Sequence, residues 1–104
     1  MAQALGLEGR FAVAGRRSPF EVRMDVLRAV ADGSAKPTRI MYRSNTSWVV
    51  LQRNLSTLLA AGFVRQGGTD LRAEYTATAT GMNVVSDYLA LLERAASELP
   101  EVRP

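Results

Sequence analysis

Arginine and asparagine side chains that could bind a polyanion gather in the middle of the chain. Residues 47–61 predict a helix. Its polar face carries Ser47, Val50, Arg53, Asn54 and Thr57. Just before it, Arg39 and Arg43 are four residues apart and would share one face of a shorter helix. Arginine binds phosphate, and both residue types form paired hydrogen bonds with base edges. Two solvated arginines are the alternative interpretation of Arg39 and Arg43.

The composition excludes several kinds of chemistry. The 104 residues include no Cys and no His. Disulfides, thiol nucleophiles, the usual zinc sites and His-based acid–base catalysis are therefore excluded. No carboxylate pair, nucleophile–base set or phosphate loop can be assembled either. We therefore expect no enzyme, no metal and no cofactor. The N-terminus has no long apolar run, so a signal peptide and a membrane span are not expected.

Charge is spread unevenly along the chain. The net charge is +3, from 13 basic and 10 acidic residues. Residues 76–104 hold two Arg against four acidic residues, whereas the first three quarters are basic. This asymmetry fits a polyanion-binding part joined to a part with another role, although +3 is also ordinary for a globular surface. The length favours one domain with a small core that oligomerisation would help.

Two short helices joined by a tight turn position the candidate side chains. The first is expected over Thr38 to Arg43, with Thr38 as its N-cap, and the turn at Ser44-Asn45. The second is expected over Ser47 to Ala61, with Asn45 or Thr46 as its N-cap. Its apolar residues recur at steps of three and four and predict a stripe facing the core: Trp48, Leu51, Leu55, Leu58 and Leu59. Gly62 is expected to end the helix in a left-handed conformation.

A helix before this pair and a hairpin after it complete a domain. Ser18-Pro19, with Glu21 three residues after Ser18, predicts a helix start with a capping box. Residues 63–66 and 71–76 alternate as two strands around a turn. Three helices followed by a hairpin is the order of a winged helix-turn-helix, whose recognition helix enters a DNA major groove. Arg65 and Arg72 would be the charges of the wing.

The last helix, from Thr78 or Thr80 to Pro100, is apolar on two neighbouring faces. One face is a heptad seam formed by Met82, Val85, Leu89, Leu92, Ala96 and Leu99. The other is formed by Val84, Tyr88, Leu91 and Ala95. One face can cover the domain's own core, which leaves the seam for a second copy of the chain. We predict a homodimer through the seam; the alternative is that both faces are buried within the monomer.

Three stretches resemble a family of small winged helix-turn-helix DNA-binding proteins found mainly in archaea. They are RSPFEVRMDVLRAVADG, PTRIMYRSNTSWVVLQRNLSTLLAAGFV and EYTATATGMNVVSDYLALLE, within residues 17–97. The middle stretch follows the family's TxIMYKANLSY entry and xGLI exit, and the third resembles its YxLTEKG segment with altered spacing. Three positions depart from the family pattern. Thr46 lies where the family prefers an apolar residue, and Asn54 lies where the family often has an aromatic residue. Ala79-Thr80 replaces the family's Glu-Lys pair.

The resemblance implies a mainly α protein with a small β-hairpin (α+β), in which a winged helix-turn-helix is followed by a long C-terminal dimerisation helix. In that family the last helices pair as an antiparallel coiled coil, whereas the seam alone fits either direction. The sequence itself predicts a flexible basic N-terminal arm over 1–17, a winged helix-turn-helix domain over 18–77, a C-terminal dimerisation helix over 78–100 and a tail over 101–104. The arm could follow DNA or have no role.

The family's DNA-contacting positions map onto this sequence. The recognition-helix entry maps onto Asn45, Thr46, Ser47 and Trp48, and further outward positions are Val50, Gln52, Arg53 and Asn54. Gln52, Arg53 and Asn54 are the expected base readers. Phosphate contacts are expected from Lys36, Arg39, Arg43 and Arg72. The Trp48 ring is expected to pack against the first helix.

The expected function is that of a cytoplasmic, nucleoid-associated transcription regulator that binds double-stranded DNA as a dimer. Two alternatives remain: a non-specific chromatin-like DNA coat, and a protein–protein interaction module, because winged helices serve both purposes. An interaction module should have an apolar outer face on residues 47–57, where this sequence predicts only Val50 as apolar. That pattern favours nucleic acid.

Overall fold

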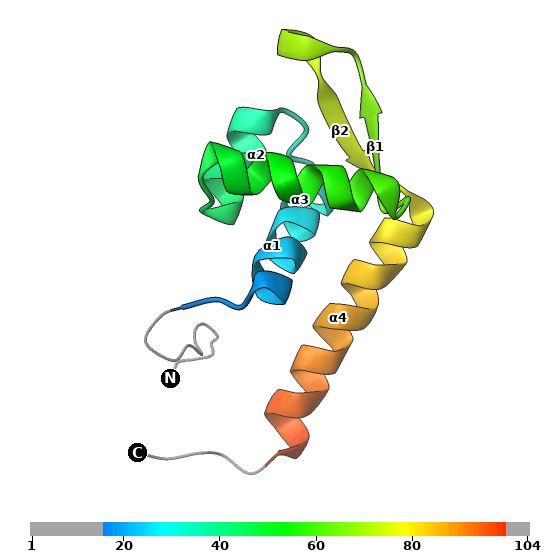
Figure 1. Ribbon diagram of the computed structural model, residues 1–104. Coiled ribbons are helices and arrows are strands. Elements are labelled where there is room, and N and C mark those ends of the chain that lie inside the picture. The colour runs from blue at the N-terminus through cyan, green and yellow to red at the C-terminus, as the bar shows by residue number, and fades with distance from the viewer. Residues whose placement is uncertain (1–15, 100–104) are drawn as a thin grey trace.

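The computed structural model describes residues 16–99, and Figure 1 shows their arrangement. The elements in chain order are α1 (Pro19–Ala31), α2 (Pro37–Ser44), α3 (Trp48–Ala60), β1 (Val64–Gly67), the short 3-10 turn η2 (Asp70–Arg72), β2 (Glu74–Ala77) and α4 (Ala79–Glu98). The mainly α architecture with one antiparallel hairpin is confirmed. Most of the expected arm, the tail and Pro100 lie outside the described residues.

Helix α1 begins with the predicted capping box. The Ser18 hydroxyl accepts a hydrogen bond from the Glu21 backbone N–H at 3.1 Å, and the Ser18 N–H donates to the Glu21 carboxylate at 2.7 Å. Pro19 occupies the first helical position, where its missing N–H costs nothing. The helix packs against α2, α3, α4 and β2, so it is the hub of the domain.

The predicted caps of the next two helices are wrong. Helix α2 begins at Pro37 with Lys36 as an N-cap that has no side-chain bond, because proline already fixes a helical φ one residue before Thr38. Asn45 ends α2 in the left-handed conformation, at φ 54° and ψ 53°, so it cannot cap α3. Ser47 caps α3 instead and accepts from the Val50 N–H at 3.2 Å.

The hairpin is shorter than predicted. Its strands pair antiparallel from Val64 opposite Ala77 to Gly67 opposite Glu74. The returning strand begins at Glu74 because residues 70–72 form the 3-10 turn. Leu71 at this turn is fully exposed. The Tyr75 N–H donates to the Ala35 carbonyl at 2.9 Å, which ties β2 to the loop between α1 and α2.

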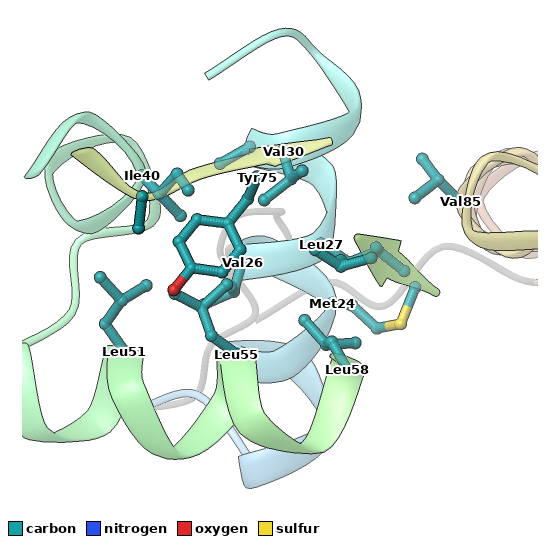
Figure 2. Packing of buried hydrophobic residues seen from close by; sticks show 13 residues of the cluster. Met24, Val26, Leu27, Val30, Ile40, Leu51, Leu55, Leu58, Tyr75 and Val85 are labelled. Atoms are coloured by element: carbon teal, nitrogen blue, oxygen red, sulfur yellow. The ribbon is translucent and has the colours of Figure 1, made fainter. Parts of the chain in front are cut away.

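The core lies where the helix-turn-helix pair meets α1 (Figure 2). The fully buried large side chains are Val26 and Leu27 of α1, Ile40 of α2, and Leu51, Leu55 and Leu58 of α3. Tyr75 adds a ring from β2, and Val85 adds a side chain from α4. Three of the five predicted stripe residues of α3 are thus core residues, and their packing sets the rotation of α3 about its axis.

The junction between α3 and α4 is held by several contacts. Gly62 ends α3 at φ 79°, as predicted. The Thr78 hydroxyl caps α4 by accepting from the Gly81 N–H at 3.0 Å and donates to the Gly62 carbonyl at 2.6 Å. Gly81 is buried so closely against Phe63 that an added Cβ would lie 2.0 Å from the Phe63 carbonyl oxygen. Figure 1 shows the hairpin and α4 leaving this junction in different directions.

The face of helix α4 that packs against the domain lies between the two predicted stripes and includes a residue of the seam. Val85, predicted for the dimer interface, is only 7% exposed and belongs to the core, so little of its side chain is left for a partner. Val84 and Tyr88, from the other stripe, also pack against the core. The close approach of Gly81 explains this, because it turns the side between the two stripes inward. The remaining seam residues stay exposed: Met82, Leu89, Leu92, Ala96 and Leu99.

Replacing Gly81 with alanine tests the junction. We expect Gly81→Ala to lower the free energy of unfolding by about 2–3 kcal/mol, because the new methyl group forces the backbone of Phe63 away. The measurement is urea denaturation followed by circular dichroism. Gly67→Ala is the matched control, since nothing lies within 4 Å of its added Cβ. Equal stability of the two variants would contradict the expectation, because it would mean that Phe63 moves away from the added methyl group without cost.

Candidate nucleic-acid interface

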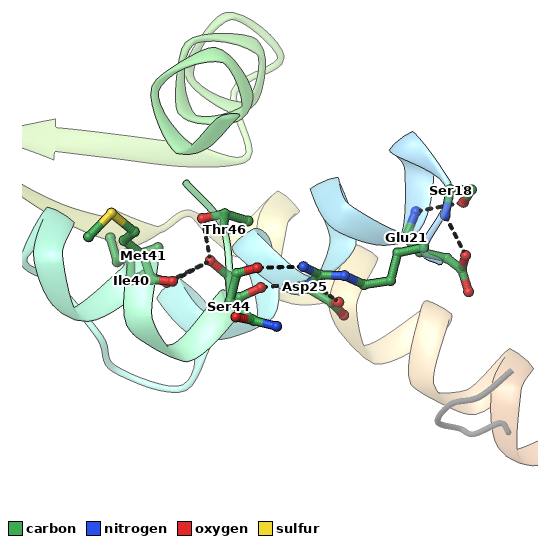
Figure 3. Close-up of polar contacts among 9 residues, drawn as sticks. Ser18, Glu21, Asp25, Ile40, Met41, Ser44 and Thr46 are labelled. Atoms are coloured by element: carbon green, nitrogen blue, oxygen red, sulfur yellow. Dashed lines mark hydrogen bonds and ion pairs between the residues drawn. The ribbon is translucent and has the colours of Figure 1, made fainter. Parts of the chain in front are cut away.

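The turn between α2 and α3 is held by a polar network (Figure 3). The buried Ser44 hydroxyl donates to the Ile40 carbonyl at 2.7 Å and lies 3.1 Å from the Thr46 hydroxyl. Thr46 is half-buried, so its side chain belongs to the turn as well as to the predicted contact set. The network fixes the direction in which α3 leaves the turn.

Arg17 ties this turn to α1. Its guanidinium donates to the Ser44 carbonyl at 2.7 Å, to the Asn45 carbonyl, and to the Asp25 carboxylate at 2.9 Å. The end of α2 leaves carbonyls without helical partners, and a charged donor satisfies them well. Arg17, expected in the flexible arm, is therefore bound to the domain.

The outer face of α3 differs from the predicted face. Asn54, expected to face outward and read bases, is 5% exposed. Its side-chain carbonyl accepts from the Arg23 Nε at 3.0 Å, and its NH₂ donates to the Val50 carbonyl at 2.9 Å. An amide can be buried at this position because a residue of α1 satisfies it. Val50 and Gln52 are half-buried.

The first turn of α3 is more exposed than predicted. Trp48 is 50% exposed, so the expected packing of its ring in the core is wrong. The buried side of α3 is centred on Leu51, Leu55 and Leu58, and at 100° per residue Trp48 lies at the edge of that arc. Val49, which the sequence interpretation missed, is 62% exposed.

The outermost row of α3 is defined by four exposed residues: Val49, Arg53, Ser56 and Ala60. Their spacings of four, three and four follow one helix face. The sequence contains a signal for this row. On a helical wheel, the row lies opposite the leucines once the buried side is centred on them rather than on Trp48.

Exposed basic side chains lie on α3 and on the two elements packed beside it, α2 and the hairpin. They are Lys36, Arg39 and Arg43 of α2 and its cap, Arg53 of α3, and Arg65 and Arg72 of the hairpin. Within residues 16–99, Arg43 alone among them forms an ion pair, at 3.8 Å from Asp32 with both side chains more than half exposed. Such a pair contributes little, so Arg43 stays available. Asn45 and Ser47 are exposed beside them at the turn.

An apolar hollow of about 440 Å³ lies between α1, α3 and α4. Phe20 and Tyr88 meet there edge to face, with ring centroids 5.8 Å apart. Burial raises the pKa of the Tyr88 phenol, the carboxylates of Asp25 and Glu21 raise it further, and Arg28 opposes them. The phenol is therefore neutral throughout the physiological range.

No helix within the described residues is long and apolar enough to cross a membrane.

Three helices, a turn that presents the outer face of the third, and a following hairpin define a winged helix-turn-helix protein. The sequence profile described as winged helix-turn-helix matches residues 16–96. The chain belongs to this family.

One relative is similar in sequence, and one solved archaeal protein is similar in fold. An uncharacterized protein of Methanocaldococcus jannaschii is 28% identical over 78 residues, which are 75% of this chain and 76% of that protein. Sso10a-2, a DNA-binding protein from Sulfolobus solfataricus, superposes with a TM-score of 0.60 at 23% identity, over 84% of this chain and all of that one.

A bacterial regulator has the same fold in part of its length. The MarR family transcriptional regulator SPO1453 of Silicibacter pomeroyi has a TM-score of 0.61 at 21% identity, over 76% of this chain and 58% of that one. This chain therefore spans less than two thirds of that regulator.

The structural role of Asn54 can be tested by stability. We expect Asn54→Ala to lower the free energy of unfolding by about 1–3 kcal/mol, because the Nε of the half-buried Arg23 loses its acceptor. Ser56→Ala, on the exposed row of the same helix, should change it by less than about 0.5 kcal/mol. Both are measured by urea denaturation. An Asn54→Ala protein as stable as the wild type would contradict the structural role.

Proposed function

We propose that the chain is a dimeric DNA-binding protein, a transcription regulator that places α3 in the major groove. The observation that carries this proposal is the exposed row of α3 together with the exposed arginines of α2 and the hairpin, which pack beside α3. The proposal is supported by the shared fold of Sso10a-2, which is a DNA-binding protein, and of SPO1453, which is a transcriptional regulator. The major groove is wide enough to admit one α-helix.

Arg53 is the proposed base reader. It lies on the outermost row of α3, where a guanidinium can pair with the O6 and N7 atoms of guanine. Asn45 and Ser47 lie at the entry to the helix, and Gln52 lies at the side of the row. Asn54 is removed from the proposed contact set because it is buried.

Phosphate contacts are proposed for the residues around α3. Lys36, Arg39 and Arg43 would meet the backbone beside the groove, since contacts to phosphate position a protein without reading sequence. The hairpin, with Arg65 and Arg72 exposed, is the proposed wing on the backbone or minor groove. Asp70 and Glu74 balance its charge, so the wing would add less to affinity than α2 does.

The proposed dimer uses the exposed part of the α4 seam. Met82, Leu89 and Leu92 are exposed although large and apolar, and Ala96 and Leu99 continue the row. Packing the same row of a second copy against it would remove this surface from water. A two-fold dimer would present two α3 helices to two half-sites.

DNA binding should depend steeply on salt. We expect affinity, measured by fluorescence anisotropy, to fall linearly on a log–log plot against salt concentration. Arg39→Ala should reduce the slope by about one for any duplex, because one phosphate contact is lost. Arg53→Ala should weaken binding and relax sequence preference. Arg94→Ala is the matched control, since Arg94 pairs with Glu98 on α4 at 2.9 Å.

The same titration separates the competing functions. A preference for the duplex upstream of the chain's own coding region over random duplex supports a specific regulator. Equal binding to both supports a chromatin-like coat. No binding at low salt contradicts the proposal and favours a protein-interaction module. For that module, the exposed side chains of Trp48 and Val49 would supply the apolar surface.

The dimer is tested by mass in solution. We expect the wild type to have twice the chain mass by light scattering. Leu92→Glu should give monomers, because a carboxylate in the paired seam loses its hydration. Leu71→Glu, at the fully exposed hairpin turn, is the control and should stay dimeric. A wild-type monomer, or a dimeric Leu92→Glu protein, would contradict pairing through this seam.

A further inference from the structure

Two apolar side chains at the start of α3 are left in water by their own domain. Trp48 and Val49 are exposed, although the buried side of the same helix is occupied by leucines. Trp48 lies at the edge of that buried side, whereas Val49 heads the outermost row. Val49 is therefore the apolar group that α3 presents most directly to whatever its outer face meets.

The position of Val49 matters because of how recognition helices bind. The N-terminal residues of such a helix are the ones that meet base edges in the major groove. Valine has no side-chain hydrogen-bond donor or acceptor, so it can neither bind phosphate nor pair with polar base atoms. The apolar group that the major groove offers in ordinary DNA is the C5-methyl of thymine.

We infer that Val49 reads the C5-methyl group of pyrimidines, so that the outer face of α3 prefers thymine over the same base without its methyl. The inference rests on the proposed DNA-binding function. Cytosine methylated at C5 carries its methyl at the same ring position. The same contact therefore makes α3 sensitive to cytosine methylation.

The backbone around Val49 is suited to this contact. Ser47 caps the helix two residues earlier, and the turn before it is held by Ser44, Thr46 and the Arg17 guanidinium. A branched side chain in a helix has one strongly preferred χ1 rotamer. Val49 thus meets a methyl group with little conformational entropy to lose. Arg53, one turn later on the same row, provides the polar contact beside it.

The test uses one mixed-sequence duplex made in three chemical forms. The duplex is amplified with thymidine triphosphate, with deoxyuridine triphosphate, or with deoxyuridine and 5-methyldeoxycytidine triphosphates together. The full chain is titrated with each by anisotropy at one low salt concentration. We expect the uracil form to bind at least about fourfold more weakly, the effect of one methyl group left in water. The methylcytosine form should recover part of that loss.

Variants assign the effect to Val49. Val49→Ser, whose short polar side chain replaces both methyl groups by a hydroxyl, should bind the thymine and uracil forms equally, whereas Ser56→Ala, on the same row, should discriminate as the wild type does. Both side chains are exposed, and circular dichroism checks that both variants fold.

Each outcome decides a different question. Equal binding of the thymine and uracil forms by the wild type overturns the inference and leaves the DNA-binding proposal standing. Discrimination that survives in Val49→Ser also overturns it. No binding to any form at low salt overturns the proposed function itself, and the apolar face is then an interface for another protein.

Discussion

The packing of α3 against α1 is the constraint on which the rest of the molecule depends. Leu51, Leu55 and Leu58 are almost completely buried, and Leu27 lies in the same core. Rotating α3 by one residue, or 100°, would bring at least one leucine into water at a cost of about 1.5–3 kcal/mol. The leucines therefore determine which side chains face outward. The outer row of Val49 and Arg53 is a consequence of how the inner row packs.

The order of elements could be predicted from the sequence because several boundaries have a local signal. These signals are helix caps and a helix end whose hydrogen bonds or backbone angles involve only nearby residues: Ser18 with Glu21, Gly62, and Thr78. The errors at the surfaces have another origin. Asn54 is buried because Arg23, 31 residues away, satisfies its amide. Val85 is buried because Gly81 lets α4 approach Phe63. Residue type alone carries no information about such distant partners.

The distribution of arginines also changes meaning once the fold is known. Arg17 and Arg23 add to the positive charge of the sequence, but their guanidinium groups hold the turn and Asn54 in place. Arg94 is paired on α4 with Glu98. Among residues 16–99, most of the exposed basic side chains lie on α2 and its cap, α3 and the hairpin. The net charge of +3 is thus a poor measure of the local field, which is set by where the unshared guanidinium groups lie.

The junction at Thr78 and Gly81 makes the length of α4 a fixed dimension of the molecule. The Thr78 hydroxyl and the buried Gly81 fix α4 to the end of α3 without a free hinge. In a pair joined antiparallel through α4, the separation of the two α3 helices would then be set by the length of α4. One inserted residue would lengthen it by 1.5 Å and also rotate the seam by 100° away from its partner. A whole heptad nearly restores the phase and adds about 10 Å, or about three base pairs. Such a protein would change the spacing of its half-sites in steps, not continuously.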